Sequence, residues 1–138
     1  MSDRNRRVLI VEDDESLRLI VSRHLRAQGY QVDEASSAEG AASAIEDGLR
    51  PGVVVLDLNL PGDTGWDLLR GPALGAAGSP PVIITSATTV SPKRLAEFGC
   101  AGYLPKPFPL DTLVATLERV LNSEEANELN LDLDGLLQ

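Results

Sequence analysis

The chain has 138 residues, of which 43% are hydrophobic and 24% charged, a composition that favours one globular core and excludes wholesale disorder. With 21 acidic against 12 basic side chains the formal charge is −9, which disfavours direct binding to nucleic acid or to anionic lipid because phosphates repel it. No apolar run reaches the ~18 residues of a membrane span, the start lacks a secretory signal, and the single Cys100 excludes an internal disulfide, so we expect a cytoplasmic protein.

Apolar runs and helical spacing alternate along the whole chain. In chain order they predict strand 7–11, helix 17–25, strand 30–35, helix 36–45, strand 53–56, helix 66–70, strand 81–85, helix 93–98, strand 102–104 and helix 110–121. Ser36 and Glu39 form a capping pair at the start of the second helix, and Gly29 is placed to end the first. The stretch 71–79 contains several Gly and Pro residues and is expected to be loose.

This alternation predicts a doubly wound α/β fold with a parallel sheet covered on both faces, since parallel strands need crossover helices. Ligands of such open sheets bind beyond the carboxyl ends of the strands. The residues that directly follow a strand are therefore the candidate site, and they are Glu12, Asp13, Asp57, Asn59, Ser86, Ala87 and Lys106.

The acidic members of this set predict a metal site. Glu12, Asp13 and Asp57 would repel one another at neighbouring strand ends unless a cation joined them, and an oxygen-only set favours Mg²⁺. Asp57 could then attack phosphorus and form an aspartyl-phosphate. Lys106 would neutralise the transferred group, and the Ser86 hydroxyl would donate to a phosphoryl oxygen.

Each of these residues also has an ordinary structural interpretation. Acidic residues after a strand often cap helices or form turns, as Asp57 could do in an Asx-turn. Ser86 could be a turn hydroxyl and Lys106 a solvated side chain. Their coincidence at four strand ends favours the functional interpretation.

Four segments in this order and spacing resemble the receiver domain of bacterial two-component response regulators. They are residues 8–15 (VLIVEDDE), 55–62 (VLDLNLPG), 82–87 (VIITSA) and 102–108 (GYLPKPF). The resemblance covers about residues 6 to 121 and implies a flavodoxin-like, five-stranded parallel sheet in the order 2-1-3-4-5 with five flanking helices. We therefore expect a receiver domain over residues 1–121 and an acidic, leucine-containing, flexible tail over residues 122–138.

The resemblance assigns roles to the candidate residues. It implies that Asp57 accepts a phosphoryl group from a phosphohistidine on a sensor histidine kinase or phosphotransfer protein. It further implies that Mg²⁺ is bound by Glu12, Asp13, Asp57 and the backbone carbonyl of Asn59. Lys106 contacts the phosphoryl group in this family and is followed by a cis peptide, here to Pro107.

The resemblance also implies a switch. Ser86 would move inward after phosphorylation and Tyr103 would turn into the vacated space, so that the face formed by residues 93–98, 102–104 and 110–121 changes shape for an output protein. Asn59 and Thr88 would tune the lifetime of the phosphoryl group. The segment from Ser86 to Tyr103 is shorter than in most of the family, so the helix within it is expected to be short or displaced.

Several alternatives stay open at this stage. The chain is either a stand-alone receiver that acts in a phosphorelay or a fragment of a longer regulator, and the family's tendency to dimerise on activation makes a homodimer one outcome. A phosphorylation-independent adaptor is the competing function. A small phosphatase of the aspartyl-phosphate type is disfavoured because Asn59 replaces its second aspartate, so no turnover enzyme is expected.

Overall fold

The computed structural model describes residues 5–62, 64–75 and 78–137, with side chains up to residue 123. Five strands are present: β1 Arg7–Val11, β2 Gln31–Ala35, β3 Val53–Asp57, β4 Val82–Ser86 and β5 Gly102–Pro105. The helices are α1 Glu15–Ala27, α2 Ala38–Glu46, α3 Gly65–Arg70, α4 Pro72–Gly75, α5 Pro92–Glu97 and α6 Leu110–Leu137.

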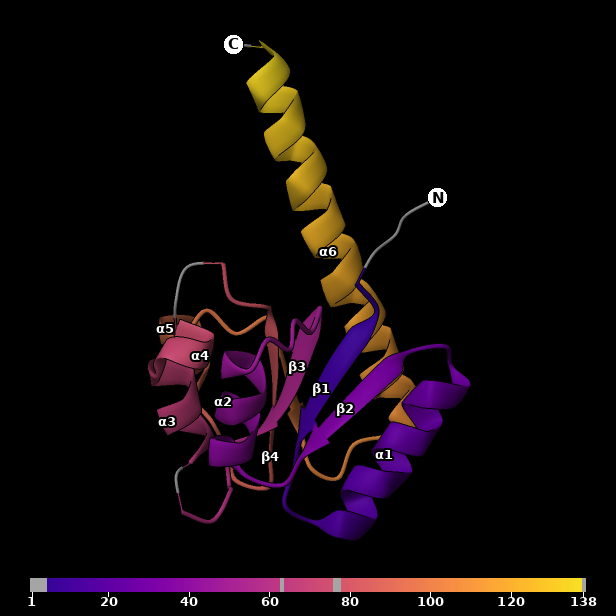
Figure 1. The fold of residues 1–138 in the computed structure, drawn as a ribbon, viewed down its shortest axis with the longest axis vertical. Coiled ribbons are helices and arrows are strands. Elements are labelled where there is room, and N and C mark those ends of the chain that lie inside the picture. Colours follow the sequence, from indigo (N-terminus) through magenta and orange to yellow (C-terminus); the bar gives the residue numbers. More distant parts are fainter. Residues whose placement is uncertain (1–4, 63, 76–77, 138) are drawn as a thin grey trace.

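The strands form one parallel sheet in the order β2-β1-β3-β4-β5, which confirms the predicted fold class. Helices α1 and α6 cover one face of the sheet, and α2, α3, α4 and α5 cover the other (Figure 1). The central strands are continuous apolar runs because both faces of a parallel sheet are buried under crossover helices.

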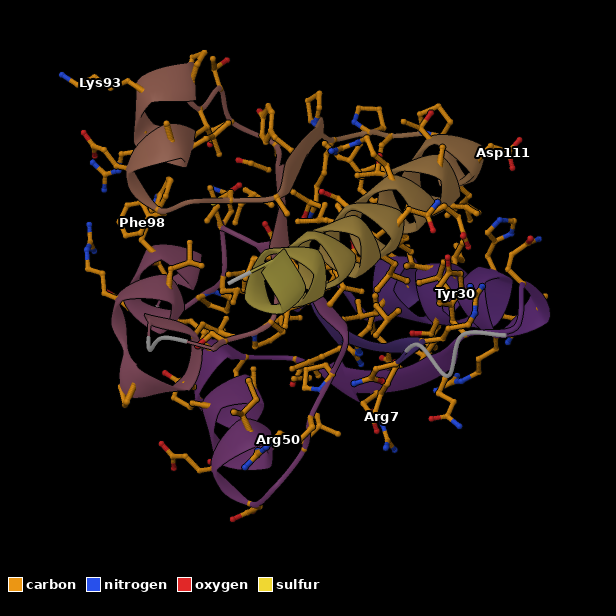
Figure 2. The ribbon with its side chains drawn as sticks, turned by 90° about the horizontal axis from the view of Figure 1, so that it is seen from above. Arg7, Tyr30, Arg50, Lys93, Phe98 and Asp111 are labelled. Atoms are coloured by element: carbon orange, nitrogen blue, oxygen red, sulfur yellow. The ribbon has the colours of Figure 1, made fainter. Side chains whose placement is uncertain are left out.

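Alternate residues of β1 divide the interior into two clusters. Val8 and Ile10 pack with residues of α1 and α6, whereas Leu9 and Val11 pack with residues of α2, α3 and α4. This division follows from the two-residue period of a strand. Seen from above, Tyr30 lies on the side of α1 and α6, and Phe98 lies on the opposite side of the molecule (Figure 2).

Short polar side chains begin most of the helices. Asp14 caps α1 by accepting from the Leu17 amide at 3.1 Å. Ser37 caps α2 by accepting from the Gly40 amide at 3.0 Å, so the cap lies one residue after the predicted Ser36. Such caps stabilise helices because the first amides have no partner within the helix.

Three helical segments refine the expectations from the sequence. The short helix α4 lies within the stretch 71–79 that was expected to be loose, and α5 has only six residues, as the short segment before Tyr103 indicates. Helix α6 continues to Leu137 instead of ending near residue 121, because residues 122–134 contain neither Gly nor Pro. That residues 122–138 form a separate tail stays a prediction. Within the described part of the chain, no helix combines the length and the apolar character needed to cross a bilayer.

Candidate functional site

The acidic residues predicted to form a site meet at the carboxyl edge of the sheet. Glu12 follows β1, where its amide donates to the Ala35 carbonyl at 3.0 Å, and Asp57 is the last residue of β3. Carboxylate oxygens of Glu12, Asp13 and Asp57 lie within 4.8 Å of one another. This edge is at the end of the molecule opposite to that from which α6 projects (Figure 1).

Lys106 joins two of these carboxylates. Its Nζ lies 2.5 Å from Glu12 Oε1 and 3.1 Å from Asp57 Oδ2. Glu12 is 5% exposed and Asp57 2% exposed, whereas Asp13 is open to solvent. The described site thus holds three clustered carboxylates and one ammonium group, which contacts Glu12 and Asp57, so an excess of negative charge remains at the edge of the sheet.

Burial and ion pairing shift the pKa values of Glu12 and Lys106. Burial raises the pKa of Glu12 above its ordinary value, even though the bond from Lys106 acts in the opposite direction. Burial by itself would lower the pKa of Lys106, but its bonds to Glu12 and Asp57 outweigh that effect and raise the pKa. The lysine is therefore held in its charged form at neutral pH.

The chemistry of the donor set fits Mg²⁺. All three clustered side chains offer carboxylate oxygens, no histidine or cysteine belongs to the described cluster, and hard oxygen donors are the ligands that Mg²⁺ prefers. The Asn59 amide donates to Asp57 Oδ1 at 2.9 Å, and the Asp14 amide donates to Glu12 Oε2 at 3.1 Å. These backbone bonds orient the two buried carboxylates before any ligand binds.

Ser86 and Thr88 lie on the neighbouring strand end and contact Asn59. The Ser86 hydroxyl donates to Asn59 Oδ1 at 2.8 Å and lies 2.9 Å from Thr88 Oγ1. Ser86 is 1% exposed, because it ends the buried strand β4. The structure therefore brings the predicted switch serine and the two predicted lifetime residues into one hydrogen-bonded group.

Tyr103 is joined to the same group from β5. It is half-buried against the core cluster that includes α3, and its hydroxyl donates to the Thr88 carbonyl at 3.4 Å. The peptide from Lys106 to Pro107 is cis, as the resemblance implies. All the predicted site residues thus lie at the carboxyl edge of the sheet or directly beside it.

Two residues at this edge were not predicted from the sequence. Arg18 donates from Nη1 to the Glu12 carbonyl at 2.9 Å and from Nε to Glu34 Oε1 at 3.2 Å, which fixes the end of β1. Gly65 allows α3 to approach β3, because a Cβ there would lie 2.7 Å from the Asp57 carbonyl oxygen. An arginine in the first turns after an acidic loop is a signal that could have identified Arg18, whereas the approach of Gly65 depends on tertiary structure.

The family of the chain follows from comparison with known proteins. The family described as response regulator receiver domain matches residues 8–118. The chain belongs to the response regulator receiver domain family. Its structure has the fold of that family, and receiver domains act as signalling switches.

Relatives of this receiver domain are found among whole regulators. Response regulator MprA of Mycobacterium sp. (strain KMS) is 33% identical over 124 residues, covering 88% of this chain and 53% of that protein. Transcriptional regulatory protein KdpE of Mycobacterium tuberculosis (strain CDC 1551 / Oshkosh) is 35% identical over 121 residues, covering 86% and 52% respectively. The chain thus spans about half the length of these relatives.

A solved structure of similar sequence supports the same conclusion. The chemotaxis protein CheY4 of Vibrio cholerae superposes with a TM-score of 0.71 at 30% identity, covering 83% of this chain and 97% of that chain. The similarity therefore extends over nearly the whole of that chain.

Proposed function

We propose that this receiver domain is the phosphoacceptor of a two-component phosphorelay in the cytoplasm, with Asp57 as the accepting residue. The observation that carries the proposal is the buried Asp57 carboxylate, which Lys106 contacts at 3.1 Å within a cluster of three acidic side chains. The phosphodonor is a phosphohistidine of a sensor histidine kinase or phosphotransfer protein.

The reaction transfers the phosphoryl group from nitrogen to oxygen. A carboxylate oxygen of Asp57 forms the new O–P bond while the N–P bond of the donor breaks, and the released imidazole of the partner takes up a proton. Lys106 faces one Asp57 oxygen and stabilises the negative charge that the phosphoryl group brings to the site.

The metal in this proposal is Mg²⁺. Glu12, Asp13, Asp57 and the backbone carbonyl of Asn59 would hold it, and when bound it supplies positive charge for the phosphoryl oxygens. The excess of carboxylates over the single ammonium of Lys106 supports this assignment, because a second cation removes the remaining repulsion.

Phosphorylation of Asp57 then changes a surface of the domain away from the site. Ser86 leaves Asn59 to bond a phosphoryl oxygen, and Tyr103 follows the movement of the residue 86–88 segment that its hydroxyl contacts. The surface that changes is formed by α5, β5 and the first turns of α6, and an output protein recognises it.

Mg²⁺-dependent labelling with acetyl phosphate tests the proposal. Intact-mass spectrometry of the parent should show one added phosphoryl group in Mg²⁺ and none in EDTA, and Asp57→Asn should remain unlabelled. Asp47→Asn, an exposed change at the end of α2, is the matched control and should label like the parent. Equal labelling of Asp57→Asn and the parent would end the proposal.

A further inference from the structure

Two hydrogen-bond donors at the end of β4 converge on one oxygen atom of Asn59. The Ser86 hydroxyl donates to Asn59 Oδ1 at 2.8 Å, and the backbone amide of Ala87 donates to the same atom at 3.2 Å. The other end of the carboxamide faces Thr88, because Nδ2 donates to Thr88 Oγ1 at 3.4 Å. The orientation of the Asn59 side chain is therefore consistent with all three of its partners.

The Ser86 hydroxyl can serve only one acceptor at a time. It carries a single proton, and its oxygen already accepts from the Thr88 amide at 3.0 Å. Ser86 is 1% exposed, so solvent does not offer it a second acceptor. As long as the proton is donated to Asn59, Ser86 cannot donate to a group on Asp57.

Asn59 also connects the two strand ends that a phosphoryl group would bridge. Its backbone amide donates to Asp57 Oδ1 at 2.9 Å, while its side chain receives the two donors from β4. The residue itself is exposed, so its carboxamide can rotate into water when a stronger acceptor arrives. An anionic oxygen is such an acceptor, because charge-assisted hydrogen bonds are stronger than bonds to a neutral amide.

We propose that the Asn59 carboxamide oxygen is an internal substitute for a phosphoryl oxygen, which holds the Ser86 hydroxyl and the Ala87 amide until a phosphoryl group on Asp57 displaces it. This inference rests on the proposed function of Asp57. Asn59 is then a positioning residue that stabilises the resting arrangement of residues 86–88. Its role differs from tuning the lifetime of the phosphoryl group, because it acts on the equilibrium before hydrolysis takes place.

Beryllofluoride, an analogue of the phosphoryl group, provides the test. Its dissociation constant is measured by calorimetry at saturating Mg²⁺ for the parent, for Asn59→Ala and for Thr89→Val. We expect about tenfold tighter binding to Asn59→Ala, equivalent to about 1.4 kcal/mol, because the competing acceptor is gone. Thr89→Val alters an exposed side chain in the same loop without removing that acceptor, so it should bind like the parent.

Two further readouts separate displacement from a general structural effect. Asn59→Asp keeps an acceptor oxygen and adds a negative charge, so it should bind beryllofluoride more weakly than the parent. In ¹⁵N-resolved spectra of the metal-loaded, analogue-free proteins, Asn59→Ala should shift the Ala87 amide proton upfield, since its acceptor is lost. Thr89→Val should leave that proton in place.

The outcomes distinguish this inference from the proposed function. If the parent binds beryllofluoride and Asn59→Ala binds it equally or more weakly, the carboxamide does not compete and the inference is overturned. If Asn59→Ala fails to fold, Asn59→Leu, of similar size and without an acceptor, is measured against the same expectation. If the parent itself neither binds beryllofluoride nor labels with acetyl phosphate, the proposed function fails first.

Discussion

Replacing Lys106 by Met should destabilise the metal-free protein by about 3 kcal/mol. The change retains most of the aliphatic stem but leaves Glu12 and Asp57 as buried carboxylates without their shared cation. Their oxygens lie within 4.8 Å, and two like charges at that separation repel by about 3.5 kcal/mol at an effective dielectric constant of ~20. Glu12 can escape this repulsion by taking up a proton, but protonating a carboxylate at neutral pH itself costs free energy, even though burial raises the pKa of Glu12.

Urea unfolding followed by circular dichroism at neutral pH in EDTA measures the effect. Lys93→Met is the matched control, since this second lysine points away from the molecule on α5 (Figure 2) and its loss should change the free energy of unfolding by less than about 0.5 kcal/mol. Saturating Mg²⁺ should restore most of the stability of Lys106→Met, because the ion neutralises the same carboxylates.

A second substitution makes the reasoning refutable. In an Asp57→Asn background one of the two buried charges is gone, so Lys106→Met should cost only about 1 kcal/mol there. The electrostatic explanation is wrong if the lysine substitution costs the same in both backgrounds. It is also wrong if Lys106→Met in EDTA is no less stable than Lys93→Met.

Three further predictions concern contacts around the sheet. Gly65→Ala should lower the free energy of unfolding by about 2 kcal/mol in chemical denaturation, because the new methyl group would lie 2.7 Å from the Asp57 carbonyl oxygen of β3. Gly71→Ala is the control, since Gly71 has a negative φ and a Cβ there makes only ordinary contacts; an equal cost for the two substitutions would contradict the close packing. Glu118→Gln should flatten the loss of stability below about pH 4.3 in acid titrations, since the bond from Tyr30 lowers the pKa of Glu118 and its stabilisation is lost as that carboxylate is protonated. Phe98→Ala should accelerate amide hydrogen exchange in α5, because this helix has no buried residue and the Phe98 ring at its end packs against Trp66. Unchanged exchange would show that other contacts hold the helix.

The fold could be predicted because its determinants are local. The β-branched composition of residues 53–56 predicts a buried central strand, and Asp57 at its end indicates which edge of the sheet carries the site. Parallel strands bring their carboxyl ends to one edge, so the proximity of Glu12, Asp13 and Asp57 followed from topology.

Side-chain partners could not be predicted in the same way. That Lys106 pairs with Glu12 as well as Asp57, and that the Asn59 carboxamide turns to Ser86, depends on distances between strands that no local pattern encodes. The apolar pattern of α6 stops at Leu121, the last core residue of the helix, so it predicts an end near residue 121; the helix continues to Leu137 because helix-compatible residues follow.

The C-terminal half of α6 extends well beyond the sheet, so a small rotation of the helix would be amplified along its length. The helix is fixed to the sheet through Leu113, Leu117 and Val120, and residues 122–137 extend beyond these anchors by about 24 Å. A rotation of ten degrees at the base would move the far tip by roughly 4 Å over that length. A small rotation of α6 where it packs on the sheet would therefore displace the C-terminal end of the helix by several ångströms, on the side of the molecule opposite to the candidate site.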